Sequence, residues 1–258
     1  MMKSAVYGPV SSWRLGASLG IDLLATSVKT CSFDCIYCQL GKTTQPVTDR
    51  REFVPIPRLV AELEHLRDVT ADCATFAGVG EPTLASNLGL AIEAVKSALN
   101  LPVAVLTNSS LMPDAEVRQD LAQADIVVVK LDAPSEDTFR LVNRPATSYS
   151  LHEILEGIKL FSSEYKGKWA LQMMFVNENR DSVGRMAKLA AELSPDEVQI
   201  NTPLRPCGVQ PLPPEDIAAI RDEFQGLRKV VTVYEAPRPQ VTPLDLEETL
   251  RRRPTEKS

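Results

Sequence analysis

The chain alternates short β-branched runs with segments of helical period, and this alternation limits the fold more than any other feature of the sequence. Residues 103–107 and 126–131 are continuous apolar runs, which is typical of strands covered on both faces. Strands separated by helices predict βα units and a parallel sheet. Further strands are expected at residues 19–25, 74–77, 169–176, 198–201 and 230–234. Periodicity alone fits both a barrel and an open doubly wound sheet.

Helix starts are visible at several points between these strands. A helix is expected near Pro57, because the leucines that follow it share one face. Ser150 and Glu153 have the spacing of a capping box, in which each side chain satisfies a backbone N–H of the first turn. Asp181 is a candidate N-cap for the helix after the fifth expected strand.

Size and charge narrow the class of protein. The 258 residues suffice for one large α/β domain that needs no disulfide support. No stretch of 18 apolar residues occurs, so no membrane-spanning helix is expected. Lys and Arg number 28 against 34 Asp and Glu, so charge gives no support for broad nucleic-acid binding. The basic tail at residues 251–253 is interpreted as a frayed, solvated terminus.

The main chemical signal is a cysteine triplet in the loop after the first expected strand. Cys31, Cys35 and Cys38 have the spacing C-x3-C-x2-C, and Tyr37 precedes the last of them. Three thiolates can hold three irons of a four-iron, four-sulfur (4Fe-4S) cluster, which normally has four cysteine ligands. The fourth iron then remains open to a ligand that is not protein.

Two other uses of these cysteines are disfavoured. Structural zinc needs four protein ligands, and the remaining Cys73 and Cys207 lack paired Cys or His spacing. Five cysteines cannot all pair as disulfides, and the N-terminal residues show no export signal, which indicates a cytoplasmic protein. Cys73 lies in an apolar run and is interpreted as a buried small hydrophobe, and Cys207 as an ordinary loop residue.

The triplet, with its aromatic residue, resembles the signature of the radical S-adenosylmethionine (SAM) superfamily. The resemblance implies a partial (β/α)6 barrel whose cluster loop follows the first strand. It also implies a 4Fe-4S cluster and SAM as cofactors, with the methionine end of SAM on the open iron. Residues 1–211 would form this core with its N-terminal lead-in, and residues 212–258 a short C-terminal α/β extension packed on it.

A second segment, Gly78 to Pro82, follows the second expected strand. On its own it is a tight strand-to-helix turn, in which glycine lets the backbone approach a neighbour closely. It occupies the position of the Gly-Gly-Glu motif of the superfamily, with Val79 in place of the first glycine. The resemblance therefore assigns Gly80 and Glu81 to the methionine ammonium of SAM.

Polar residues follow the later strands, and a barrel would bring them to one mouth. They are Asn108, Lys130, Asp132 and Arg205. The resemblance favours Asn108 and Asp132 as ligands of the SAM ribose or carboxylate, and Tyr37 beside the adenine. Lys130 interrupts an apolar run and is unlikely to be buried unpaired. It is expected either to bind an anion or substrate at the mouth or to pair with Asp132, and Arg205 is a further substrate candidate.

The resemblance also implies a reaction class. The reduced cluster would pass one electron to the sulfonium of SAM, and the resulting 5′-deoxyadenosyl radical would abstract a substrate hydrogen. In this chemistry the protein supplies binding, orientation and exclusion of water. An external reductant such as a flavodoxin or a ferredoxin is implied.

Longer blocks of the sequence suggest a substrate class. Residues 7–22, 29–41, 75–84, 130–133 and 143–145 resemble the iron–sulfur oxidoreductases grouped with the wyosine synthases, which rebuild a tRNA guanosine. RNA or nucleoside modification is therefore the first hypothesis, although no cysteine precedes Cys31 for a second cluster. The alternatives are a radical activase or modifier of a protein or peptide, and a non-enzymatic iron–sulfur redox sensor.

Overall fold

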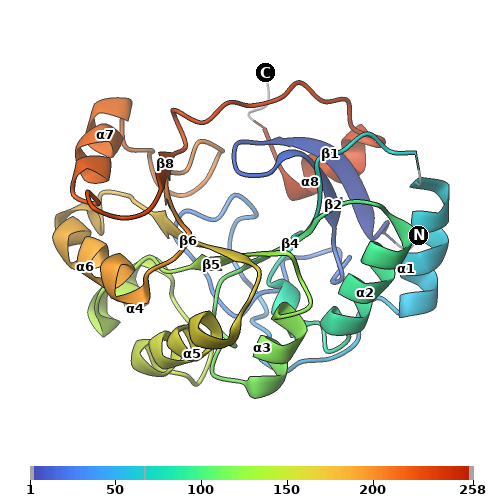
Figure 1. The fold of residues 1–258 in the computed structure, drawn as a ribbon, viewed down its shortest axis with the longest axis horizontal. Coiled ribbons are helices and arrows are strands. Elements are labelled where there is room, and N and C mark those ends of the chain that lie inside the picture. Colours follow the sequence, from blue (N-terminus) through green and yellow to red (C-terminus); the bar gives the residue numbers. More distant parts are fainter. Residues whose placement is uncertain (1–2, 67, 256–258) are drawn as a thin grey trace.

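The computed structural model describes residues 3–66 and 68–255, and its centre is one eight-stranded sheet (Figure 1). The strands lie side by side in the order of the sequence, from β1 to β8. The first two form an antiparallel hairpin, and every later pair is parallel. Their bounds are β1 (Val6–Ser12), β2 (Gly16–Ile21), β3 (Cys73–Phe76), β4 (Val103–Thr107), β5 (Ile126–Lys130), β6 (Lys168–Met174), β7 (Glu197–Asn201) and β8 (Val230–Thr232).

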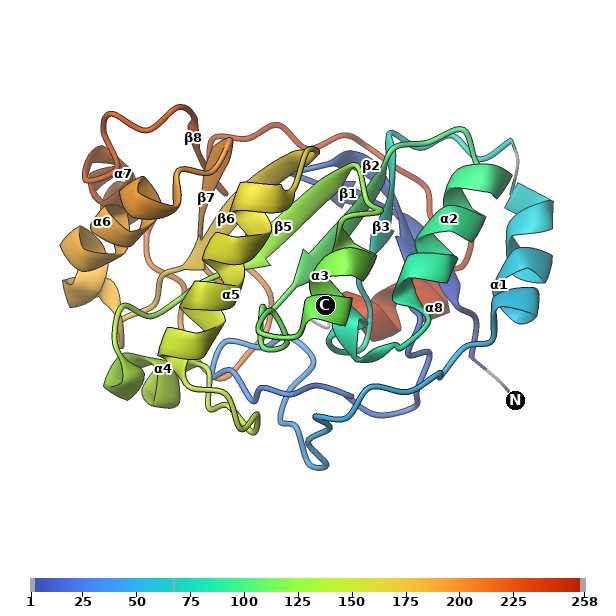
Figure 2. The ribbon, with the colours of Figure 1, turned by 60° about the horizontal axis from the view of Figure 1, so that its bottom comes forward.

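Seven helices cover the outer face of this curled sheet, as Figures 1 and 2 show. They are α1 (Ile56–Leu63), α2 (Leu88–Ala98), α3 (Ala115–Leu121), α4 (Glu136–Val142), α5 (Leu151–Glu164), α6 (Val183–Leu193) and α7 (Pro214–Asp222). Each crossover returns the chain beside the strand just left, which a right-handed βαβ connection favours. The result is a half-barrel, so the predicted α/β fold with a partial barrel is confirmed.

The two faces of the sheet differ in polarity because strand residues alternate between them. Leu19 and Ile21 of β2 are fully buried in the main apolar core, together with leucines and isoleucines of the outer helices. The alternate residues point to the inner face, where the Ser18 and Thr75 hydroxyls lie 2.7 Å apart. The half-barrel therefore has an apolar exterior under the helices and a partly polar interior.

Helix starts agree with the sequence at one position and differ at another. The capping box of α5 is confirmed, since Ser150 accepts from the Glu153 N–H and the Glu153 carboxylate accepts from Ser150. The Asp181 prediction is wrong. Asp181 lies in a 3-10 turn, Arg180–Ser182, and the N-cap residue of α6 is Ser182, without a side-chain cap. A preceding turn already fixes this helix start.

The N-terminal hairpin adds a strand that the pattern of apolar residues did not predict. β1 contains Gly8 and Pro9, and its register with β2 shifts between Tyr7 and Val10. Such an irregularity breaks the period of two on which a strand prediction depends. The ring of Tyr7 lies over β2, where a Cβ on Gly20 would come within 2.2 Å of it.

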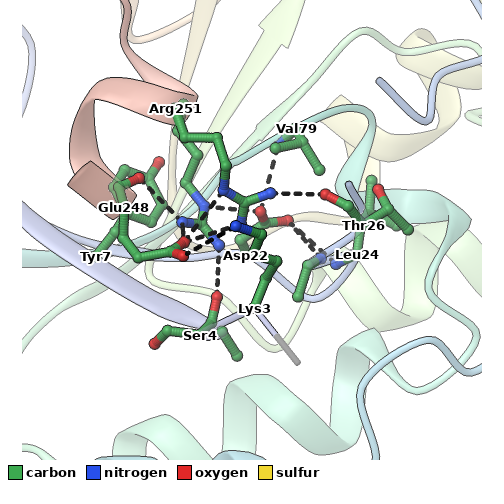
Figure 3. Close-up of polar contacts among 12 residues, drawn as sticks. Lys3, Ser4, Tyr7, Asp22, Leu24, Thr26, Val79, Glu248 and Arg251 are labelled. Carbon is green, nitrogen blue, oxygen red and sulfur yellow. Dashed lines mark hydrogen bonds and ion pairs between the residues drawn. The ribbon is translucent and has the colours of Figure 1, made fainter. Parts of the chain in front are cut away.

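The C-terminal segment corrects the prediction of a solvated tail. Helix α8 (Leu246–Arg252) packs on β1, and Arg252 is only 1% exposed. Its guanidinium donates to the Asp22 carboxylate at 2.8 Å and lies 4.7 Å from the Tyr7 ring centre. Figure 3 shows Asp22, Tyr7 and Glu248 gathered around the end of this helix. The tail is thus anchored by a buried ion pair. Within the described residues, no helix is long and apolar enough to cross a membrane.

Candidate functional site

The cysteine loop runs along the edge of the sheet where the parallel strands end, below the strands in Figure 2. It is tied to the loop after β3 by a short parallel bridge between Thr30 and Gly80. The Thr30 N–H donates to the Val79 carbonyl at 2.9 Å, and the Glu81 N–H donates to the Thr30 carbonyl at 3.1 Å. The two motifs found in the sequence are therefore in direct backbone contact.

Gly80 makes this contact possible because it has no side chain. A Cβ at this position would lie 1.5 Å from the Thr30 carbonyl oxygen and 2.9 Å from a methyl of Leu24. The first clash is with a backbone carbonyl oxygen, so no movement of a side chain could relieve it. The glycine is thus required by the approach of two loops.

Replacing Gly80 by alanine is expected to lower the free energy of unfolding by about 3 kcal/mol, at the upper end of overpacking costs. The matched control is Gly184→Ala in α6, where a Cβ meets no atom within 4 Å. That change should be neutral or stabilise by up to about 1 kcal/mol, because alanine favours helix. Urea unfolding followed by circular dichroism compares the two variants. Equal stability would contradict the close contact described here.

The thiols of the loop are partly buried and have donors beside them. The amide of Asn108 lies 3.5 Å from the Cys31 sulfur, and the amide of Asn143 lies 3.5 Å from the Cys35 sulfur. Burial, followed by the neighbouring Cys35, raises the pKa of Cys31 to about 12. Burial, followed by Asp132, raises the pKa of Cys35 to about 11. Thiolates here need a compensating positive charge, which a bound metal centre provides.

Asp132 is the centre of a buried polar network behind the loop. One carboxylate oxygen accepts from the Tyr37 hydroxyl and, at 2.8 Å, from the Asn143 amide. The other accepts from the Met174 N–H at 2.8 Å and lies 3.3 Å from the Lys130 ammonium. Four partners on one buried carboxylate fix its orientation, as buried polar groups require.

Of the two expectations for Lys130, the structure shows the pairing with Asp132. The ammonium also lies 4.6 Å from the centre of the Tyr37 ring, in a cation–π position. A small pocket lies beside these groups, with Asn108, Lys130, Asp132 and Asn143 in its wall. The mouth of the half-barrel therefore brings together most of the polar residues that the sequence placed there.

Glu81 is held by the protein itself. It is 2% exposed, and its carboxylate accepts hydrogen bonds from Thr83, from the Thr107 hydroxyl at 2.7 Å and from the Asn108 N–H at 2.6 Å. Burial raises the pKa of Glu81, and these donors oppose that shift. The side chain fastens the end of β4 to the loop after β3, which leaves the backbone of Gly80 and Glu81 toward the cysteine loop.

Asn143 is the residue that sequence reasoning missed. It follows α4 at the helix C-cap, and its amide bridges Cys35, Tyr37 and Asp132. Its side-chain oxygen is buried and has no hydrogen-bond partner within the described chain. An asparagine at the end of a helix carries no periodic signal, so only the folded chain shows that it reaches the cysteines.

The structure places the other two cysteines and Arg205 in different surroundings. Cys73 is 3% exposed in β3, so its prediction as a buried small hydrophobe is confirmed. Cys207 lies in the loop after β7 and packs on an apolar group containing Tyr37, Met174 and Val176, on which Cys35 also packs. Arg205 does not join the Asp132 network. It lies near Tyr7, whose hydroxyl is uncharged at neutral pH because burial raises its pKa to about 12.

The chemistry of the loop residues fits an iron–sulfur cluster. The loop carries three thiols, and the amides of Asn108 and Asn143 are directed at two of their sulfurs. The buried side-chain oxygen of Asn143 has no hydrogen-bond partner within the described chain. Thiolates with hydrogen bonds to sulfur are the usual surroundings of such clusters.

Comparison with known proteins agrees with this geometry. The family model described as the Radical SAM superfamily matches residues 26–190. A UPF0026 protein of Synechocystis is 42% identical over 80% of this chain and 78% of its own length. A UPF0026 protein of Methanocaldococcus jannaschii is 36% identical over 87% of this chain and 73% of its own length.

Solved structures show the same fold. Streptococcus suis SuiB bound to S-adenosylmethionine matches with a TM-score of 0.61 at 14% identity. The match covers 80% of this chain and 48% of SuiB, so this chain spans about half of that protein. At this identity the likeness concerns the fold alone.

Proposed function

This chain belongs to the radical SAM superfamily, and on that basis we propose that it cleaves S-adenosylmethionine reductively and takes a hydrogen atom from a substrate. The observation that carries the proposal is the cysteine loop, whose Cys31 and Cys35 sulfurs face the amides of Asn108 and Asn143. The family implies SAM and a 4Fe-4S cluster as cofactors.

The residues of the site divide into ligands and supports. Cys31, Cys35 and Cys38 would hold the cluster through their thiolates. When bound, the cluster would supply the electron for reductive cleavage of SAM. Gly80 and Glu81 would offer backbone groups to the methionine end, and Asn108 and Tyr37 would face the rest of the cofactor.

Asp132 and Lys130 would set the electrostatic environment beside the cysteines. Asp132 is buried and held by Tyr37 and Asn143, so it orients both residues toward the loop. The Lys130 ammonium offsets the carboxylate charge and would face a substrate at the mouth of the half-barrel. Arg205 is a second candidate for substrate binding.

The partners and substrate are proposals as well. A flavodoxin- or ferredoxin-type protein would supply the electron. RNA or a nucleoside is the first substrate candidate, because the sequence blocks quoted above resemble enzymes of that group. A protein or peptide substrate is the second, and a non-enzymatic redox sensor the third. We place the protein in the cytoplasm, with residues 1–211 as the catalytic core and 212–258 as an extension packed on it.

Anaerobic reconstitution followed by dithionite and SAM tests the proposal. The wild-type protein is expected to release 5′-deoxyadenosine and methionine, measured by chromatography, and to release neither without the reductant. The assay is repeated with RNA and with peptide added, because some enzymes cleave SAM only beside their substrate. A fully loaded cluster that never cleaves SAM under any of these conditions would contradict the enzyme and support the sensor.

A further inference from the structure

Four arginines from distant parts of the chain lie near enough to one another for their charges to interact. Arg14 lies in the turn between β1 and β2, Arg205 in the loop after β7, Arg238 in the segment after β8, and Arg253 directly after α8. Figure 1 shows that the segment from β8 to α8 crosses the open side, beside the hairpin. The four guanidiniums are close enough to repel one another.

These four side chains lack the partners that a structural role would provide. In the described part of the chain, none of them forms an ion pair with a carboxylate, and only Arg238 makes a side-chain hydrogen bond, to the Val233 carbonyl at 3.4 Å. The Nε and Nη1 atoms of Arg14 are buried without a hydrogen-bond partner, and its guanidinium lies 4.7 Å from the centre of the Trp13 ring. The adjacent Arg252, by contrast, is held by Asp22 and Glu248.

Arg14, Arg205 and Arg253 are partly buried and Arg238 is exposed, so the first three guanidiniums are partly removed from water at a cost in free energy. Burial, followed by the charges of Arg253, Arg205 and Arg238, lowers the pKa of Arg14 to about 9. Burial, followed by Arg253 and Arg238, lowers the pKa of Arg205 to about 10. An arginine normally stays charged well above these values. A bound anion would remove both the repulsion and the unsatisfied donors.

The chemistry of the cluster points to phosphate rather than to a single carboxylate. A phosphate ester carries up to two negative charges and several strong acceptor oxygens. The planar fork of arginine matches phosphate oxygens in a bidentate manner. The chain as a whole has a net charge of −6, so a phosphate would be repelled elsewhere and attracted at this local concentration of positive charge.

We propose that Arg14, Arg205, Arg238 and Arg253 form a binding site for phosphate groups of the substrate at the open side of the half-barrel. That the bound phosphate belongs to the substrate rests on the proposed function. The binding of phosphate by the four arginines does not rest on it. The phosphate can belong to a phosphorylated small molecule or to the backbone of RNA. Both present the same group to the same four guanidiniums.

The test measures binding without reductant, so it is independent of SAM cleavage. Inorganic phosphate, a nucleoside 5′-monophosphate, the unphosphorylated nucleoside and a short RNA are titrated into the reconstituted protein by calorimetry. Arg14→Gln and Arg253→Gln are each expected to weaken phosphate-dependent binding roughly ten- to a hundredfold, as loss of a charge-assisted hydrogen bond does. The control is Arg228→Gln, an exposed arginine paired with Asp196, which should bind as wild type.

Thermal unfolding separates binding from a structural role. Phosphate should raise the melting temperature of the wild type and of Arg228→Gln, and leave that of Arg14→Gln unchanged. Without phosphate, Arg14→Gln should unfold close to the wild-type temperature, because removal of a charge without a carboxylate partner offsets loss of the contact with the Trp13 ring. If RNA binds tightly and the nucleoside monophosphate binds weakly, the phosphate belongs to an RNA backbone. If the monophosphate binds tightly and RNA binds weakly, it belongs to a small molecule. Absence of phosphate-dependent binding, or equal binding by all variants, overturns the proposal even if SAM is cleaved.

Discussion

Replacement of Cys35 by alanine is expected to abolish formation of 5′-deoxyadenosine in the reduced, reconstituted protein. Loss of a group that only supports a metal ligand already costs about 10- to 100-fold in affinity or activity, and loss of a ligand should exceed this. Cys35 lies beside the Asn143 amide, and burial, followed by Asp132, raises its pKa. The measurement is product formation per protein, together with iron content and the visible absorption of the cluster.

Cys73→Ala provides the matched control for this experiment. Cys73 is another buried cysteine, but it lies within β3 and makes no contact with the loop that carries the triplet. This variant should keep wild-type iron content and product yield, at a modest cost in stability for the lost sulfur. A Cys35→Ala protein that binds iron and cleaves SAM like wild type would show that the triplet is not the cluster site.

Replacement of Arg252 by alanine is expected to lower the free energy of unfolding by about 3–5 kcal/mol, the cost of leaving one member of a buried ion pair alone. Arg252 and Asp22 are each 1% exposed, and their contact distance is 2.8 Å. Arg252 also donates to the Ser4 carbonyl, so its loss removes a link to the N-terminal segment. Figure 3 shows that groups from several segments of the chain surround Asp22. Equilibrium unfolding in urea measures the change.

Two further variants decide whether the ion pair is the cause. Arg228→Ala removes an exposed arginine that is 2.7 Å from Asp196, and it should cost no more than about 1 kcal/mol. Asp22→Asn combined with Arg252→Met should be more stable than Arg252→Ala, because no unpaired charge then remains buried. If the Arg252→Ala protein were as stable as Arg228→Ala, the anchoring of α8 by this pair would be refuted.

The parallel part of the fold could be predicted from sequence because its signals are local. The run at residues 103–107 coincides with β4, and the strand starting at residue 126 ends within one residue of its prediction. β1 could not be predicted in the same way, because Gly8 and Pro9 interrupt its alternation. Its place at the edge of the sheet depends on pairing with β2.

The site residues divide in the same way, into those that a local sequence pattern predicts and those whose partners are distant in the sequence. Asn108 and Asp132 were expected near each other, because parallel strands end at one edge of a sheet. Asn143 and Arg252 could not be placed, since their partners lie far away in sequence. The Asn143 amide meets Cys35 108 residues earlier, and Arg252 meets Asp22 230 residues earlier. The basic tail was predicted to be a solvated terminus because the sequence does not show that Asp22 is the partner of Arg252.

The position of α8 has a consequence for the order of events during biosynthesis. Arg251 donates to the Thr26 carbonyl and Gln39 donates to the Arg252 carbonyl, so both flanks of the cysteine loop are held by this helix. The helix emerges from the ribosome more than 200 residues after that loop. A nascent chain therefore exposes its three thiols before the contacts that restrain them exist. The restrained shape of the loop is consequently a property that it gains only after α8 has been made.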